Sequence, residues 1–377
     1  AKKKEHMLYF DHSASTPIHP AVLNLIQELE LNHFGNPSSA HRFGQKSRLD
    51  IEIARKQMAD AIGCYPYEII FTGGGTEANN QVLKSFNQSE KNHVVTNPIE
   101  HPAILKVLTT ISSQKISFDL VPVNEKGRVS VSEIESKIQE KTGLISVMLA
   151  NNEVGTVQPI KEIVSLAHQN GVRVHTDAVQ CLGKMPVDVK DLGVDFLSLS
   201  AHKFYGPKGI GVLYFKNKDA LSPFMLGGGQ ESGLRAGTEN IAAIAGMGLA
   251  AELATDGLGN HITELKSFES SFKSELLSFS PNAIFNGDPE NKLPGLVSVS
   301  FPGYRSDILL AKLDRAGMAV SSGSACGAGE VKPSGVLSAM GVDDKTNIST
   351  LRFSFGASNT SEQVDLLLSE LKTILTD

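Results

Sequence analysis

Short apolar segments alternate with longer segments of helical period between residues 68 and 215. The longer segments, such as 76–86, 101–111 and 160–169, repeat apolar residues every three or four positions, which is typical of amphipathic helices. Strands that alternate with such helices favour βαβ units and a mostly parallel sheet covered on both faces. The strands of this α/β arrangement are expected at 68–72, 93–96, 144–149, 172–176, 196–200 and 211–215.

The pattern changes after a glycine-rich segment at 227–237. A long helical pattern follows from Thr238 to about Phe279, with a break near 257–259. Helical patterns at 21–32 and 38–62 precede the first strand and could pack with the last part of the chain. The last part of the chain predicts a second, smaller α+β domain, with elements at 296–301, 306–316, 318–321, 351–355 and 361–375.

The composition narrows the class of protein. The chain of 377 residues has 35 basic and 41 acidic side chains and a formal net charge of −6, which argues against a broad nucleic-acid-binding face. No apolar run approaches the ~20 residues of a membrane span, and no apolar stretch follows the basic residues 2–4 as it would in a signal peptide. Three cysteines are too few and too scattered for a disulfide framework or a metal knuckle, which favours a reduced, cytoplasmic setting without a metal site.

The sequence around Lys203 carries the strongest chemical signal. An apolar strand ends in Ser200, His202 and Lys203, and a turn with glycine and proline follows. Lysine is rarely buried without a purpose, and a lysine among hydroxyl and imidazole groups at a strand end suits a Schiff base with pyridoxal phosphate (PLP). An isolated lysine in a turn would more often lie at the surface, so the interpretation depends on the other segments.

Two further segments supply groups that a PLP site requires. The pyridinium nitrogen needs a carboxylate, and Asp177 ends an apolar strand with Gln180 close behind, although an aspartate there could also cap a helix. The phosphate needs hydroxyls and backbone N–H groups at a helix N-terminus, which Gly75 and Thr76 offer. This glycine-rich loop matches neither the nucleoside-triphosphate nor the dinucleotide pattern.

Polar residues follow other strands as well. His101 could stack on a flat cofactor and exchange protons, or simply begin a helix. Asn152 comes directly after an apolar strand, and Arg352 interrupts one, where it could face solvent or bind the carboxylate of an amino acid. Ligands of parallel sheets bind beyond the carboxyl ends of the strands, so we expect these side chains to lie near one site.

The third cysteine differs from the other two. Cys326 lies within a segment of small residues, Ser-Ser-Gly-Ser-Ala-Cys-Gly-Ala-Gly, that offers little to pack against. An exposed, reactive thiol on a flexible loop is the natural interpretation. Cys64 and Cys181 have apolar or helical neighbours and are expected to be small core residues.

Taken in order, these segments closely resemble the cysteine desulfurases of the NifS/IscS class, which are aminotransferase-like PLP enzymes of fold type I. The resemblance runs from Tyr9 to Leu375 and implies a large domain with a mostly parallel seven-stranded sheet and a smaller α+β domain. It rests on Asp11-x-x-Ala14, Phe34-Gly-Asn-Pro-Ser38, Thr72 to Glu77, Glu100-His101, Asn151-Asn-Glu153, His175-Thr-Asp-Ala-x-Gln180, Ser200-Ala-His-Lys203, Gly227-Gly-Gly-Gln-Glu231, Arg235-Ala-Gly-Thr238, Ser321-Ser-Gly-Ser-Ala-Cys326 and Arg352-Phe-Ser354.

The resemblance implies a role for each matching residue. Lys203 would bind PLP covalently and move the α-proton of the substrate, Asp177 would pair with the pyridine nitrogen, and His101 would stack on the ring. Gln180 and Asn152 would lie near the ring oxygen and the substrate. The phosphate would be held by Thr76, Ser200 and His202, with backbone access at Gly75.

The resemblance also implies the substrate and the reaction. Arg352 would bind the carboxylate of L-cysteine, and Cys326 would take its sulfur, which leaves alanine and an enzyme persulfide for an acceptor protein of unknown identity. Thr238 would reach the phosphate of a neighbouring subunit, which implies a homodimer with shared sites. We therefore expect residues 7–20 to join the small domain, 21–256 to form the PLP-binding domain and 257–377 to form the small domain with the cysteine loop; residues 1–6 would be a non-native remnant or a disordered tail.

The cysteine segment resembles the long-loop group of this class, because the Arg-x-Gly-His-His-Cys pattern of the short-loop group is absent from the sequence. After Cys326 the chain has Gly-Ala-Gly-Glu-Val-Lys-Pro, where the housekeeping enzymes carry a Ser/Thr-rich stretch, and it ends at Asp377 without their C-terminal extension. Both departures leave the acceptor open among iron–sulfur assembly, tRNA thiolation and DNA phosphorothioation.

Other activities stay open at this point. Selenocysteine lyase or cysteine-sulfinate desulfinase activity would make the cysteine dispensable. An ordinary aminotransferase would have no use for the Cys326 loop, and an inactive binding scaffold would have no use for Lys203.

Overall fold

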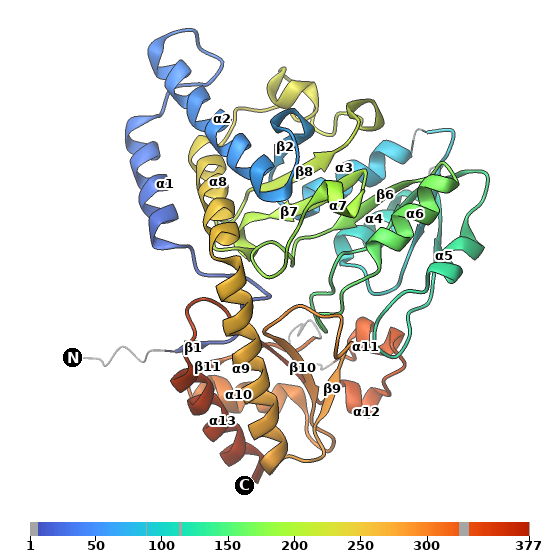
Figure 1. Cartoon of the computed structure of the whole chain (residues 1–377), viewed down its shortest axis with the longest axis vertical. Coiled ribbons are helices and arrows are strands. Elements are labelled where there is room, and N and C mark those ends of the chain that lie inside the picture. Colours follow the sequence, from blue (N-terminus) through green and yellow to red (C-terminus); the bar gives the residue numbers. More distant parts are fainter. Residues whose placement is uncertain (1–6, 88, 113–114, 324–331, 377) are drawn as a thin grey trace.

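The computed structural model describes residues 7–87, 89–112, 115–323 and 332–376. Figure 1 shows an upper unit built around a seven-stranded sheet and a lower unit built around a three-stranded sheet. The consecutive helices α8 (Ile241–Asp256) and α9 (Leu258–Phe279) run from the upper unit into the lower one. Cys326 and residues 1–6 lie outside the described residues.

The large sheet is mostly parallel, which confirms the predicted α/β fold class. Strand β8 runs antiparallel to its neighbours β2 and β7, and the other neighbouring strands pair in parallel. From one edge to the other, the order is β2 (Ile69–Thr72), β8 (Gly211–Phe215), β7 (Phe196–Ser200), β6 (Arg173–Asp177), β5 (Thr142–Ser146), β3 (His93–Thr96) and β4 (Ser117–Leu120).

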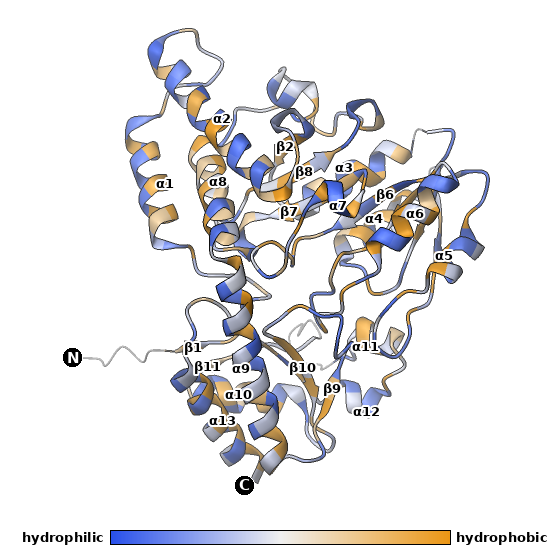
Figure 2. Ribbon diagram, in the orientation of Figure 1, coloured by the Kyte–Doolittle hydropathy of each residue, from blue (hydrophilic) through white to orange (hydrophobic). Residues whose placement is uncertain are grey.

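Helices cover both faces of this sheet, and successive residues of a strand point to opposite faces. Leu144 and Phe196 pack into a core with α3 (Gly75–Phe86) and α4 (Pro102–Ile111), whereas their neighbours Ile145 and Leu197 pack into a separate core. The helices on that second face are α5 (Val131–Lys137), α6 (Ile160–Gln169) and α7 (Val189–Leu192). Figure 2 shows apolar and polar residues alternating along these helices.

Helices α1 (Pro20–Asn32) and α2 (Arg42–Ile62) pack on α8. Small residues on α8 permit the close approach: a Cβ at Gly248 would lie 2.6 Å from the Cα of Ala54 on α2. Val22, Ala54 and Met247 are fully buried in the core of the large sheet, so the N-terminal helices belong with the upper unit.

The lower unit has its own core. The antiparallel strands β9 (Ile284–Asn286), β10 (Leu296–Ser300) and β12 (Thr350–Ser354) form its sheet, and β1 (Leu8–Tyr9) pairs in parallel with β11 (Met318–Ala319). Phe272 packs on Phe353, with ring centroids 4.8 Å apart. The other helices of this unit are α10 (Ser306–Arg315), α11 (Gly335–Ala339), α12 (Asp344–Asn347) and α13 (Ser361–Thr376).

Several boundaries differ from those expected. The strand predicted at 144–149 is β5, which ends at Ser146; beyond it, the N–H groups of Val147 and Leu149 donate to His175 and Asp177 across the sheet. Strands β4 and β9 were not expected, because each is a short, partly exposed edge strand without a continuous apolar run. Within the described residues, no single helix is both long and apolar enough to span a membrane; α8 and α9 meet both criteria only together, and the chain bends by 72° between them.

Candidate active site

Polar side chains from both units meet in a cavity of about 310 Å³. The cavity lies beyond the carboxyl ends of β6 and β7, at the N-termini of α3 and α4, where ligands of parallel sheets bind. Ten of the residues that the sequence singles out line it: Gly75, Thr76, His101, Asn152, Asp177, Gln180, Ser200, His202, Lys203 and Arg352. A larger hollow of about 760 Å³ lies elsewhere, along Arg55, Tyr67 and Glu231, and contains none of these residues.

Lys203 lies one turn beyond the end of β7. Its Nζ atom donates hydrogen bonds to the carbonyl oxygens of Ser13, at 2.6 Å, and of Ala14, at 2.8 Å. Burial, together with the nearby charge of Arg352, lowers the pKa of Lys203 to about 8. An appreciable fraction of the amine is therefore uncharged near neutral pH, as a nucleophilic lysine requires.

Asp177 ends β6, and its carboxylate is fixed from two sides. Asn79 on α3 donates to Oδ2 at 2.8 Å, and the backbone N–H of Val179 donates to Oδ1 at 3.0 Å. The contact with Val179 closes a local turn and does not cap a helix, because the next helix begins only at Val189. Because each carboxylate oxygen accepts more than one hydrogen bond, Oδ2 can still receive a donor from the cavity.

His101 begins a helix and also lines the cavity. It caps α4, because its Nδ1 atom accepts from the N–H of Ala103 at 3.1 Å, and it lines the cavity. Burial lowers the pKa of His101, against the attraction of Asp177. With Nδ1 an acceptor, the neutral ring carries its proton on Nε2.

The end of the cavity at the start of α3 has the character of an anion site. Gly75 is the first residue of the helix, and a Cβ there would lie 2.7 Å from the Cγ2 of Val179. Thr76, Ser200 and His202 face the same space, which continues into an open hollow of about 770 Å³. Helix N-termini and hydroxyl groups bind phosphate. Burial lowers the pKa of His202 to about 4, with nearby lysines adding to the effect.

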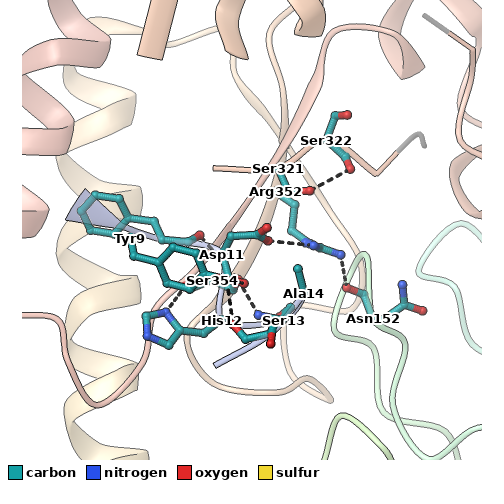
Figure 3. Close-up of polar contacts among 12 residues, drawn as sticks. Tyr9, Asp11, His12, Ser13, Ala14, Asn152, Ser321, Ser322, Arg352 and Ser354 are labelled. Atoms are coloured by element: carbon teal, nitrogen blue, oxygen red, sulfur yellow. Dashed lines mark hydrogen bonds and ion pairs between the residues drawn. The ribbon is translucent and has the colours of Figure 1, made fainter. Parts of the chain in front are cut away.

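Arg352 enters the cavity from β12 of the lower unit (Figure 3). Its Nη1 atom donates to the backbone oxygen of Asn152 and its Nη2 atom to Oδ1 of Asp11, both at 2.9 Å. Its Nε atom is buried and has no hydrogen-bond partner among the described residues. Buried donors are normally satisfied, so this one indicates a missing acceptor such as a carboxylate. Asn152 contributes its backbone here, and its side chain points away from Arg352 (Figure 3).

The sequence pattern gives no role to three partly or fully buried ionisable residues. Lys184 donates to Oε1 of Gln180 at 3.3 Å, and burial lowers its pKa to about 7. Glu100 accepts from the N–H of Met148, and burial raises its pKa to about 8. Glu153 accepts from Ser334, and burial raises its pKa to about 7. Glu100 and Glu153 stand within quoted motifs, whereas nothing local distinguishes Lys184 from a surface lysine.

One of the expected site residues does not line the cavity, and another lies outside the described residues. Thr238 is exposed and does not line it. Cys326 lies outside the described residues, but Ser321, five positions before it, pairs with Arg352: the N–H of Arg352 donates to the carbonyl of Ser321 at 2.7 Å, and the N–H of Ser321 donates back at 3.2 Å. Within the described part of the chain, no group of three acidic, histidine or cysteine residues is placed to hold a metal ion.

The residues of the cavity fit PLP. They provide an amine of lowered pKa, a carboxylate held by two donors, a neutral imidazole and a glycine-start helix for a phosphate group. A mostly parallel seven-stranded sheet with such a lysine beyond a strand end defines a PLP-dependent enzyme of fold type I.

Comparisons with known proteins agree with this class. The family model Aminotransferase class-V matches residues 8–367. Cysteine desulfurase IscS of Clostridium botulinum is 41% identical over 373 residues, which are 98% of this chain and 94% of that protein. A solved NifS-like protein superimposes with a TM-score of 0.93 at 36% identity, covering 98% of this chain and 99% of the other, and SspA in complex with cysteine superimposes with a TM-score of 0.81 at 34% identity, covering 93% and 99%. The chain belongs to the aminotransferase class-V family and, within it, to the cysteine desulfurases of the IscS/NifS type.

Proposed function

We propose that this protein is a PLP-dependent cysteine desulfurase, which converts L-cysteine to L-alanine and leaves the sulfur as a persulfide on Cys326. The observation that carries the proposal is that Lys203, Asp177, His101 and Arg352 line one cavity, while the backbone of Arg352 pairs with Ser321, five residues before the cysteine. The reaction balances without a further reactant: cysteine loses one sulfur atom as its Cβ–S bond breaks, and the thiol of Cys326 gains that atom as an S–S bond forms.

The substrate is held by its carboxylate. The unpartnered Nε of Arg352 supplies a donor, and the contacts of Nη1 and Nη2 with Asn152 and Asp11 hold the guanidinium in place. A planar guanidinium held in this way binds a carboxylate with defined orientation. The proposed substrate is therefore a free amino acid.

The cofactor would be held by the groups that line the same cavity. PLP, when bound, supplies an electron sink for breaking the bonds at Cα and Cβ of an amino acid. Lys203 would attach it, Asp177 would pair with its pyridine nitrogen, and His101 would lie against its ring. Gln180, which lines the same cavity, would lie near the ring oxygen of PLP. The phosphate would be held by Gly75, Thr76, Ser200 and His202.

Lys203 is also the residue placed to move a proton. Burial lowers the pKa of Lys203 to about 8, so its Nζ atom can take up the α-proton of the substrate and return it near neutral pH. His101, neutral with its proton on Nε2, is a second donor in the cavity.

Substitution of Cys326 tests the proposal. Cys326→Ala should retain the visible absorbance of the bound cofactor and lose sulfide release from L-cysteine by at least 100-fold, whereas the matched variant Cys64→Ala should retain both. Desulfuration at the wild-type rate by Cys326→Ala would overturn the persulfide mechanism. Selenocysteine and cysteine sulfinate, tested on the same variant, would reveal the lyase and desulfinase activities, which do not need the thiol.

We further propose a homodimer in which Thr238 serves the phosphate site of the partner. Thr238 is exposed, at the end of a glycine-rich segment, and it does not line the cavity of its own chain. Mixing a Lys203→Ala chain with a Thr238→Ala chain tests this sharing, because one of the two site types in the mixed dimer then keeps both residues. Activity should reappear on mixing; a monomer by light scattering would contradict the proposal.

The persulfide would be delivered to an acceptor protein of unknown identity, in the cytoplasm. Cys64 and Cys181 are free thiols in the described structure, in keeping with a reducing compartment. Capture of partners by the persulfidated enzyme, with Cys326→Ala as the control, would identify the acceptor and decide among iron–sulfur assembly, tRNA thiolation and DNA phosphorothioation.

A further inference from the structure

Glu153 fills the space between two residues that flank the Cys326 segment in the sequence. The hydroxyl of Ser334 donates to its Oε2 atom at 2.5 Å. Gly323 contacts the same oxygen: a Cβ at Gly323 would lie 2.4 Å from Oε2 of Glu153 and 3.6 Å from the Cβ of Ser334. Gly323 lies three residues before Cys326, and Ser334 lies eight residues after it. One carboxyl group therefore contacts the chain on both sides of the cysteine.

Ser334 is itself held firmly. Its hydroxyl caps α11 by accepting from the N–H of Leu337 at 3.3 Å. Asn347 accepts from the N–H of Ser334 at 2.7 Å and donates to its carbonyl at 2.9 Å. Ser334 belongs to the lower unit and Glu153 to the upper unit, so their hydrogen bond links the two units.

The turn that carries Glu153 also carries the backbone oxygen that Arg352 binds. Asn151 orders this turn, because its Oδ1 atom accepts from the N–H of Glu153 at 2.8 Å and its Nδ2 atom donates to the carbonyl of Ile99 at 3.0 Å. Arg352 reaches Asn152 with its side chain and Ser321 with its backbone. Arg352 therefore contacts both Asn152 and Ser321. Glu153, which follows Asn152 in the chain, contacts Gly323, which lies two residues after Ser321.

A carboxyl group makes this contact at a cost in folding stability. Among the described residues Glu153 has no ion-pair partner within 4 Å, and burial raises its pKa to about 7, against the effects of Ser334 and Arg352. A largely desolvated acid without an ion-pair partner costs stability. The hydroxyl of Ser334 can donate to the carboxylate, and it can accept from the protonated acid, so the contact persists in both states.

We propose that Glu153 is a positioning residue for sulfur transfer: it fixes both flanks of the Cys326 segment relative to Arg352, the residue that holds the substrate. The proposal rests on the proposed desulfurase function. Glu153 touches neither the cavity nor its reacting groups, so cofactor binding and cysteine binding should not depend on it, whereas the transfer of sulfur to Cys326 should.

The test compares single-turnover persulfide formation on Cys326, followed by mass spectrometry, with the absorbance change that cysteine causes in the holoenzyme. Glu153→Ala should lower the rate of persulfide formation at least tenfold and leave the affinity from the absorbance change within twofold. Glu153→Gln retains an acceptor for Ser334 and should stay within threefold of the wild-type rate. Equal rates for Glu153→Ala and the wild type would overturn the proposal.

Gly323→Ala supplies an independent variant of the same contact, because its new Cβ displaces the carboxyl group without changing Glu153. It should slow persulfide formation to a similar degree, and the double variant Glu153→Ala/Gly323→Ala should be no slower than the slower single variant. Multiplied effects in the double variant would show that the residues act separately, against the proposal. If Glu153→Ala fails to fold, Gly323→Ala and Ser334→Ala decide the question.

Two further observations separate the possible failures. Loss of cofactor absorbance or a lowered melting temperature in Glu153→Gln would assign the residue a purely structural role and overturn the proposal. Absence of persulfide in the wild-type protein would instead refute the desulfurase function itself.

Discussion

The Nη2 atom of Arg352 lies 2.9 Å from Oδ1 of Asp11, although the two residues are 341 positions apart in the sequence. Asp11 belongs to the N-terminal segment, and Arg352 belongs to β12. Their ion pair therefore holds the N-terminal segment against the lower unit, next to the cavity that Arg352 lines. The ion pair uses the Nη2 atom of the guanidinium and leaves the Nε atom available for a ligand.

Arg352→Lys should raise the KM for cysteine at least tenfold and leave cofactor absorbance unchanged. A lysine ammonium keeps the charge but cannot contact Asp11, Asn152 and a substrate carboxylate in one plane. Steady-state kinetics measure the effect. Asp11→Asn, which retains an acceptor for Nη2, serves as the control and should change KM by less than threefold. An unchanged KM in Arg352→Lys would exclude the assigned role in carboxylate binding.

Covalent attachment of the cofactor should occur at Lys203 and not at Lys184. Both lysines are buried with lowered pKa values, about 8 and about 7 respectively, but only Lys203 lines the cavity. After reduction of the holoenzyme with borohydride, peptide mass spectrometry should find the adduct on Lys203. Lys203→Ala should lose the adduct entirely, and Lys184→Met should retain it. An adduct on Lys184 would contradict the proposed site.

Cys64 and Cys181 should resist alkylation in the native protein. Both are buried, and burial raises the pKa of Cys64 to about 12 and that of Cys181 further still, so almost no thiolate forms at neutral pH. Counting alkylated thiols by mass spectrometry should show neither residue modified within the time that a peptide thiol needs to react completely. Unfolding in guanidinium should expose both, and rapid native labelling of either would contradict the described packing.

Glu153→Gln should change how stability depends on pH. The pKa of Glu153 is about 7 in the folded protein and near its ordinary value of 4.5 when unfolded. Between these values the folded state binds the extra proton, so the stabilising contribution is complete below pH 4.5 and is lost as the pH rises through 7.

The stability of Glu153→Gln relative to the wild type should therefore rise between pH 4.5 and pH 8, by up to about 3 kcal/mol. Urea unfolding of the cofactor-free protein at several pH values measures the difference. The exposed residue Glu275 provides the control, because Glu275→Gln replaces a solvated carboxyl group. A flat difference between Glu153→Gln and the wild type would show that folding does not raise the pKa of Glu153.

The repeating pattern of the sequence predicts the large sheet well because its strands are buried on both faces. Strands β3, β7 and β8 and helix α6 have the expected bounds. The pattern fails at β4 and β9, which are half exposed and carry no apolar run. It also placed the end of β5 too late, since the residues after Ser146 stay buried although the strand has ended.

The chemistry of the individual residues was visible in the sequence, because each one follows a strand or begins a helix, and a parallel sheet brings those points together. Lys203, Asp177, His101 and Gly75 could be identified in this way before any contact was known. What only the tertiary structure decided depends on burial and on contacts between distant segments. No local pattern shows that Lys184 is desolvated, that Arg352 pairs with Asp11, or that Glu153 lies between Gly323 and Ser334, since these contacts join parts of the chain that approach one another only after both units have folded.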